Sequence, residues 1–180
     1  KIIAIISNNP KASGLKIKGN FEKKVIDEKN FTKKSFDNEL NSYLKKLKPD
    51  LICLAGYMKI LPPLIVNKWK NKIINVHPSL LPSFKGLDTH ERVLKNNVKI
   101  TGCTIHFVDN TLDGGPIIAQ AATIVENNMN VQALREKVLK LEHIIYPEVV
   151  KMFANKKISI KNKKIIINKK SRLNYFIKSI

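Results

Sequence analysis

The sequence has 180 residues, of which 43% are hydrophobic and 7% aromatic, and its formal net charge is +19 at pH 7. This length and composition predict one globular domain with a full hydrophobic core, and they exclude an intrinsically disordered chain. Two cysteines are too few for a disulfide framework or a C-x-x-C metal site, and no apolar run reaches the roughly 20 residues of a membrane span.

Strand and helix patterns alternate through the first half of the chain. Apolar β-branched runs predict strands, and apolar residues at i, i+4, i+7 and i+8 predict an amphipathic helix. The predicted strands are 1–7, 24–27, 50–57 and 73–76, and the predicted helices are 35–48, 62–69 and 88–95. The uninterrupted apolar run at 50–57 is typical of a parallel strand that is covered on both faces. The expected class is therefore α/β, with a mostly parallel sheet and helices on both faces.

The second half of the chain adds two strands and a long helix. Strands 99–108 and 116–125 flank the short loop DNTLDGGP, so antiparallel pairing is expected near the C-terminal end. A helix begins near Asn130, and Pro147 is expected to interrupt or kink it. Lysines surround the apolar residues 165–167, which predicts a protected edge strand.

The positive charge raises the question of a nucleic-acid partner, because clustered Lys and Arg neutralise phosphates. Only three of the 33 basic residues are arginine, and the lysines are spread along the whole chain. Arginine is the residue that forks onto phosphates and base edges. The pattern favours a solvated lysine surface over attraction of a polyanionic substrate, and dedicated nucleic-acid binding is not expected. Together with the cysteine usage, it predicts a cytoplasmic protein that is not bound to a membrane.

Two strand ends carry side chains with useful chemistry. Asn75 and His77 are two residues apart, so on an extended backbone both point to one face of the sheet. Histidine can donate or accept a proton near neutral pH, and an asparagine amide is a neutral donor for an oxyanion. Asp113 lies in the loop LDGGP, and a carboxylate beside His77 would favour the protonated ring and orient it.

Each of these residues also has an ordinary structural explanation. Asn75 and His77 could form a turn pair, and Asp113 could be a turn residue of a D-G-G loop. His106 alternates with apolar neighbours, which is typical of a structural histidine in a core. His90 lies in the first turn of a predicted helix, where exposure is the default. The spacing of Asp113 and His77 along the chain does not show whether the two side chains are close in space, because this depends on the fold.

A family resemblance lies in four segments in this order: LICLAGYMKILPPLIV, INVHPSLLPSFKGLDTHERVL, TGCTIHFVDNTLDGGPIIAQ and EHIIYP. They resemble the phosphoribosylglycinamide formyltransferases of de novo purine biosynthesis, and the similarity continues from about residue 1 to residue 160. The resemblance implies a Rossmann-like formyltransferase fold. It also implies small-molecule substrates, 10-formyltetrahydrofolate as co-substrate, and no metal. It does not predict an oligomeric state.

The resemblance implies roles for individual residues. Asn75, His77 and Asp113 would be catalytic: Asn75 and protonated His77 would stabilise the oxygen of the tetrahedral intermediate, His77 would donate a proton, and Asp113 would favour the protonated ring. Glu142 and Pro78 would contact the ribonucleotide. The implied folate-binding residues are Lys33, Met58, Lys59, Ile60, Leu61, Asn75, Asp109, Asn110, Thr111, Leu112 and Asp113. The family usually has arginine at Lys59, so a forked or stacked contact is lost there.

One departure concerns the substrate phosphate. The family begins with a strand and a glycine-rich turn whose backbone amides hold a phosphate ahead of a helix, and no such turn is present in this sequence. We therefore expect residues 1–180 to be a single formyltransferase domain that lacks the first strand, the phosphate loop and the first helix.

Three alternatives stay open. A methionyl-tRNA formyltransferase shares HPSLLP but needs a further C-terminal domain. A formyltetrahydrofolate hydrolase shares the Asn, His and Asp, but usually has a second histidine where Pro78 stands. An inactive basic fragment is the third.

Overall fold

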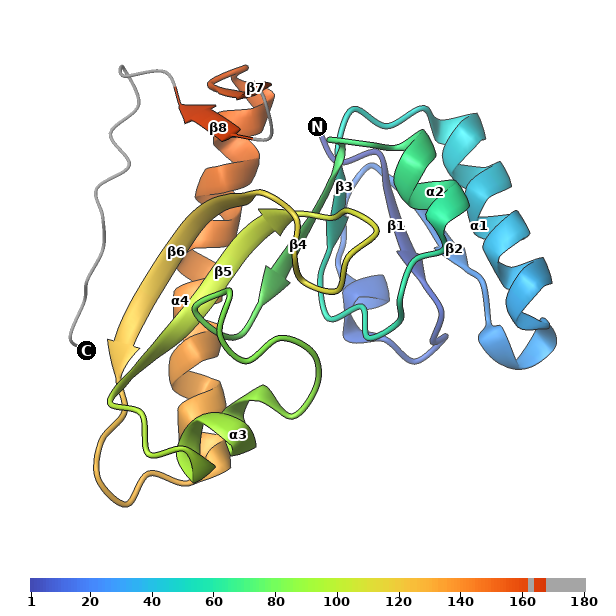
Figure 1. Ribbon diagram of the computed structural model, residues 1–180. Helices are drawn as coiled ribbons and strands as arrows, with labels where there is room; N and C mark the ends of the chain where they lie inside the picture. Colours follow the sequence, from blue (N-terminus) through green and yellow to red (C-terminus); the bar gives the residue numbers. More distant parts are fainter. Residues whose placement is uncertain (162–163, 168–180) are drawn as a thin grey trace.

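The computed structural model describes residues 1–161 and 164–167 (Figure 1). The chain alternates between strands and helices, as its apolar periodicity predicts. In order, the elements are β1 (Ala4–Ser7), β2 (Glu22–Val25), α1 (Lys33–Leu47), β3 (Ile52–Leu54), α2 (Pro63–Lys68), β4 (Ile73–His77), α3 (Thr89–Lys95), β5 (Ile100–Phe107), β6 (Ile117–Ile124), α4 (Val131–Ala154), β7 (Ile158–Lys161) and β8 (Lys164–Ile167). Short 3₁₀ turns at Ser13–Lys16 and Glu28–Asn30 precede β2 and α1.

The strands pair in parallel early in the chain and antiparallel later. β1 pairs in parallel with β2, and β3 in parallel with β4. β4, β5 and β6 continue the second sheet with antiparallel pairing, and β7 and β8 form an antiparallel pair that contains the expected edge strand. The α/β class and the antiparallel C-terminal strands are confirmed.

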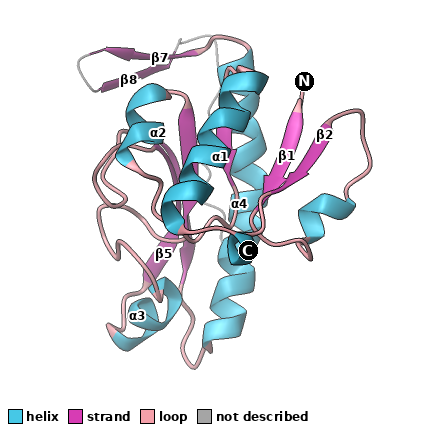
Figure 2. Cartoon of the chain, turned by 90° about the vertical axis from the view of Figure 1, so that its right-hand side faces the viewer, coloured by secondary structure: helices cyan, strands magenta, loops and turns pink. Residues whose placement is uncertain are grey.

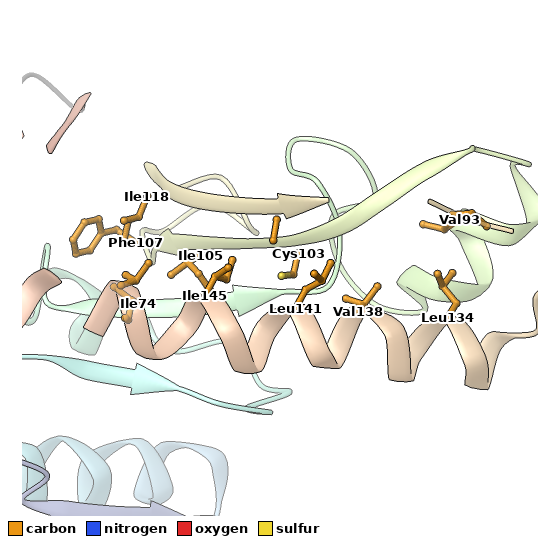
Figure 3. Packing of buried hydrophobic residues seen from close by; sticks show 13 residues of the cluster. Ile74, Val93, Cys103, Ile105, Phe107, Ile118, Leu134, Val138, Leu141 and Ile145 are labelled. Carbon is orange, nitrogen blue, oxygen red and sulfur yellow. The ribbon is translucent and has the colours of Figure 1, made fainter. Parts of the chain in front are cut away.

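Helices cover both faces of the four-stranded sheet. On one face, apolar side chains of α4 pack against β4, β5 and β6, as Figure 3 shows. On the other face, α1 and α2 form a second core that includes Ile73, while the next residue, Ile74, belongs to the α4 core. Ile6 of β1 and Ile52 of β3 both pack on this second core, so α1 lies against both sheets (Figure 2). Side chains at 74 and 75 must therefore point to opposite faces.

Polar side chains cap the N-terminal ends of the two long helices. Thr32 accepts a hydrogen bond from the Ser35 amide at the start of α1, and Asn130 accepts one from the Ala133 amide at the start of α4. Pro147 lies inside α4, and the helix continues to Ala154, so the predicted interruption is wrong and only a bend is compatible with this helix. The continuous apolar face of α4 on the sheet holds the helix through the proline.

Two predicted strands are shorter than expected. The strand predicted at 1–7 begins at Ala4, and the one predicted at 50–57 covers only Ile52–Leu54. The Cys53 side chain is exposed, so the expectation that this strand is covered on both faces is wrong. Among the described residues, β3 pairs only with β4, and the core of α1 and α2 covers only the face of Ile52 and Leu54. No helix in 1–161 or 164–167 has the length and apolar character of a membrane span.

Candidate functional site

The centre of the site is the end of β4. The register pairs Asn75 with His106 and His77 with Thr104 on β5. Ile74 and Val76 pack in the α4 core, so Asn75 and His77 point to the other face of the sheet. The sequence prediction that these two side chains share a face agrees with this packing.

Asp113 lies beside His77, although 35 positions separate them in the chain. Its Oδ2 atom is 3.3 Å from Nδ1 of His77, and both side chains are largely buried. The other ring nitrogen, Nε2, is 2.9 Å from the carbonyl oxygen of Phe84. Both ring nitrogens thus face acceptors, an arrangement that satisfies both protons of an imidazolium and leaves one acceptor unmatched if the ring is neutral.

A tight loop aims the Asp113 carboxylate at the histidine. Asp113 itself has a left-handed backbone (φ 46°), and its Oδ2 atom accepts a hydrogen bond from the Gly86 amide at 2.8 Å. A Cβ atom on Gly115 would lie 1.9 Å from the Phe107 carbonyl oxygen. The second glycine of LDGGP is therefore required where the loop returns to the sheet.

His106 is a member of the site that the sequence analysis treated as structural. Its Nδ1 faces the Phe107 carbonyl at 3.0 Å, its Nε2 is 3.4 Å from Nδ2 of Asn75, and the Asp113 carboxylate is 3.8 Å away. Burial lowers the pKa of His106, so the ring is neutral at neutral pH. When the neutral ring carries its proton on Nδ1, its Nε2 atom accepts a hydrogen bond from the Asn75 amide. This hydrogen bond fixes the orientation of the amide.

The signal for His106 was available in principle. It is the last residue but one of β5, and Asn75 lies two residues before the end of β4, so both are close to a strand end. Only the antiparallel register of β4 and β5 puts the two opposite each other. His90, expected at the surface, is instead half-buried, and its Nδ1 has no hydrogen-bond partner among the described residues.

The segment between β4 and α3 forms the wall of the site next to His77. Phe84, Gly86 and Asp88 all have positive φ. For a non-glycine residue such as Phe84, the left-handed conformation costs roughly 1–2 kcal/mol. Asp88 occupies the N-cap position of α3, but its side chain makes no capping hydrogen bond. Its left-handed backbone places it outside the extended geometry of an N-cap.

The implied folate-binding residues between β3 and α2 differ in exposure. Met58 and Ile60 are 74% and 78% exposed, whereas Leu61 belongs to the core of α1 and α2. Lys59 forms an ion pair with Glu28 and lies over the Phe36 ring.

Lys33, the first residue of α1, is exposed. Among the described residues, the side chains of Asn75, His77 and Asp113 make no hydrogen bond or ion pair with Lys33 or with the 58–61 segment.

The loop from Asp109 to Leu112 is linked to α2. Asn110 donates a hydrogen bond to the Asn67 side chain at 2.8 Å, and the Asp109 carboxylate accepts from the Thr111 amide at 2.9 Å. Leu112 is exposed. The loop thus presents the apolar Leu112 side chain, while one side-chain hydrogen bond ties it to α2 and another stabilises its own turn.

The implied substrate residues lie apart. Pro78 follows His77 directly, whereas Glu142 lies on α4, on the other side of the sheet, near Cys103 and Tyr146. Burial raises the pKa of Glu142. Among the described residues Glu142 makes no hydrogen bond or ion pair with Asn75, His77 or Asp113.

Known proteins match this chain over most of its length. The model of the formyl transferase family matches residues 1–150. A trifunctional purine biosynthetic protein adenosine-3 from Bos taurus is 41% identical over 157 residues, which are 86% of this chain but 16% of that protein. A phosphoribosylglycinamide formyltransferase from Haemophilus influenzae is 36% identical over 165 residues, which are 90% of this chain and 78% of that protein.

Solved structures agree with the sequence matches. A phosphoribosylglycinamide formyltransferase from Anaplasma phagocytophilum has a TM-score of 0.88 and 40% identity, and the match covers 96% of this chain and 83% of that one. A formyltetrahydrofolate deformylase from Pseudomonas syringae has a TM-score of 0.81 and 25% identity, with 92% of this chain and 56% of that one covered. The fold is shared by both groups, and the higher identity lies with the formyltransferase.

Proposed function

The chain belongs to the formyl transferase family, and we propose that it transfers the formyl group of 10-formyltetrahydrofolate to the amine of phosphoribosylglycinamide. The observation that carries the proposal is the 3.3 Å contact between His77 and Asp113, with Asn75 on the same face of the sheet. Acyl transfer from an amide-like donor needs an oxyanion partner and a proton carrier, and these side chains supply both.

In the proposed reaction the substrate amine attacks the formyl carbon, and a carbon–nitrogen bond forms as the carbonyl oxygen takes up negative charge. The Asn75 amide donates a hydrogen bond to that oxygen, and the protonated His77 ring stabilises its charge. When the intermediate collapses, the bond between the formyl carbon and the folate nitrogen breaks. His77 gives its proton to the leaving nitrogen and recovers one from the attacking amine.

The contact of His77 with Phe84 sets a condition on this step. Nε2 of the ring faces the Phe84 carbonyl at 2.9 Å while Nδ1 faces Asp113. A formyl oxygen bound beside Asn75 therefore competes with the Phe84 carbonyl for the Nε2 proton. A small reorientation of the ring about the Asp113 contact allows the exchange without separating the charged pair.

The residues that would hold the two substrates stay part of the proposal. Met58, Ile60 and Leu112 are exposed apolar side chains that a bound folate would cover. Glu142 and Pro78 would contact the ribonucleotide. We also place the protein in the cytoplasm, where its two free cysteines stay reduced.

Hydrolysis of the formyl folate is the second candidate, because deformylases share the fold. Pro78 stands where the resemblance implies a second histidine in hydrolases, which favours transfer. The two reactions differ in the acceptor: water gives formate, whereas the amine of the ribonucleotide gives a formamide.

We further propose that a strand and a glycine-rich loop outside residues 1–180 complete the substrate site. Among the described residues, β1 pairs only with β2 and β3 only with β4, so each parallel strand has one unpaired edge. The exposed Ile2, Ile3 and Cys53 lie at or next to these two strands. A strand between β1 and β3 would pair both edges and cover apolar surface.

Expression tests this second proposal. Residues 1–180 alone should show little turnover with phosphoribosylglycinamide, and adding the upstream coding sequence should restore it. Substantial turnover by residues 1–180 alone would contradict the need for a further strand and loop.

A histidine substitution tests the activity itself. In the chain extended by its upstream coding sequence, His77→Ala should abolish formylation of phosphoribosylglycinamide and leave binding of the folate nearly unchanged, because the ring acts on the reacting atoms. His143→Ala is the matched control, since His143 is an exposed residue of α4 without a hydrogen bond among the described residues. Equal activity of the two variants would rule out the proposed role of His77.

A further inference from the structure

An arginine on α3 reaches back to the strained segment that borders the site. Arg92 Nη1 donates to the carbonyl oxygen of Lys85 at 2.5 Å and lies 3.4 Å from that of Leu87. Its guanidinium lies 5.7 Å from the centre of the Phe84 ring. One side chain thus contacts three of the four residues from 84 to 87, a segment we call the 84–87 loop.

The same loop contacts both members of the charged pair. The Phe84 carbonyl faces Nε2 of His77 at 2.9 Å, and the Gly86 amide donates to Oδ2 of Asp113 at 2.8 Å. Movement of the loop would therefore change the environment of His77 and Asp113 at the same time.

The two halves of the β4–α3 connection are held differently. The first half is tied to the buried Thr104 of β5, whose hydroxyl donates to the Ser79 carbonyl and accepts from the Leu81 amide. The second half contains the left-handed Phe84 and Gly86, and it is held from α3 by Arg92 and by the Thr89 hydroxyl, which donates to the Gly86 carbonyl. Residues in such strained conformations persist only when their surroundings hold them.

We propose that Arg92 is a positioning residue that holds the 84–87 loop so that Phe84 and Gly86 fix the orientation of the His77 and Asp113 side chains. The inference rests on the proposed function for its effect on rate, and on geometry alone for its effect on the histidine ring. Arginine suits this role because a planar guanidinium serves two carbonyls and stacks on an aromatic ring together, whereas a lysine ammonium is a single point charge.

Two substitutions at Arg92 and one control test the proposal. Arg92→Met removes every polar contact with the loop, and Arg92→Lys keeps the charge and loses the planar guanidinium. Lys95→Met is the control, because Lys95 lies on the same helix, is exposed, and has no hydrogen bond or ion pair among the described residues. In the chain extended by its upstream coding sequence, we expect kcat for formyl transfer to fall about tenfold or more in Arg92→Met, since small misplacement of reacting groups has effects of this size. The KM values should stay within about twofold, because the side chain of Arg92 contacts the 84–87 loop and not the residues proposed to hold the substrates.

A second readout does not depend on activity. The ring ¹⁵N and ¹H resonances of His77 report which nitrogens carry protons and whether they are hydrogen-bonded, and we expect them to change in Arg92→Met and to change less in Arg92→Lys. Thermal unfolding of all three variants separates a local effect from loss of the fold, and Arg92→Lys serves if Arg92→Met does not fold.

The outcomes separate the two proposals. If His77 resonances in both Arg92 variants match those of Lys95→Met, the positioning role is overturned, whatever the activity. If the resonances change as expected but the wild-type protein does not formylate phosphoribosylglycinamide, the positioning role stands and the proposed function falls.

Discussion

At the scale of single residues, the site combines two histidines with different partners. His77 has an acceptor at each ring nitrogen, whereas His106 has an acceptor at Nδ1 and the Asn75 amide at Nε2. The contacts of His77 suit a protonated ring, and those of His106 suit a neutral one. One ring can therefore carry charge and a proton while the other holds the asparagine amide in place.

The buried His106 predicts a pH dependence of stability. Burial lowers its pKa in the folded protein, so below the unfolded value of about 6.5 the unfolded chain binds more protons. The stabilising contribution of the neutral ring is present above that pH and is lost as the pH falls through the lower, folded pKa. The free energy of unfolding of the wild type should exceed that of His106→Gln at pH 7.5, and the difference should shrink at pH 5.

Urea denaturation of both proteins at the two pH values measures this difference. Comparison with His106→Gln removes the contribution of His90, whose pKa is also lowered by burial. A difference that stays constant between pH 7.5 and pH 5 would show that His106 is not the neutral ring described above.

Glu142 predicts a conflict between stability and function. Burial raises its pKa, so its stabilising contribution is present below the unfolded value near 4.3 and is lost as the pH rises through the folded pKa. At pH 7.5 Glu142→Gln should therefore unfold at higher urea concentration than the wild type, and the gap should narrow near pH 4. The same variant should have a higher KM for the ribonucleotide if Glu142 binds it. An unchanged urea midpoint at pH 7.5 would contradict the cost of its burial.

At the scale of elements, apolar periodicity predicts the helices that pack on the core, but it does not predict strand lengths that depend on pairing between distant segments. The apolar spacing in α1 and α4 predicts both helices because each buries one face against a sheet. The run at 50–57 is apolar throughout, yet only Ile52–Leu54 pairs as a strand, because pairing depends on a neighbour that the run itself does not specify. The left-handed conformation of Phe84 has no local signal, since phenylalanine ordinarily avoids it.

The N-cap of α4 gives a prediction at this scale. The Asn130 side chain accepts a hydrogen bond from the Ala133 amide at 2.8 Å, and loss of such a cap costs about 1 kcal/mol. Asn130→Ala should lower the free energy of unfolding by this amount. Asn155→Ala, at the other end of the same helix, is the control, because that exposed side chain has no hydrogen bond among the described residues. Equal effects in thermal or urea unfolding would show that the cap does not stabilise α4.

At the scale of the whole molecule, the site exists only because distant segments converge on one face of the sheet. Asn75 and His77 come from β4, His106 from β5, and Asp113 from the loop that follows β5. Spacing along the chain predicts the shared face of Asn75 and His77, but the approach of Asp113 requires the antiparallel pairing of β4 and β5. The family resemblance identified Asp113 before the fold did, since it places whole motifs together and spacing does not.

The fate of the formyl group is the most direct test of the proposed activity. The chain, extended by its upstream coding sequence, is incubated with 10-formyltetrahydrofolate labelled at the formyl carbon, with and without phosphoribosylglycinamide, and the label is followed into the ribonucleotide and into free formate. We predict that the label appears as an amide on the ribonucleotide amine and depends on that substrate. Release of the label as formate at the same rate with and without the ribonucleotide would contradict formyl transfer.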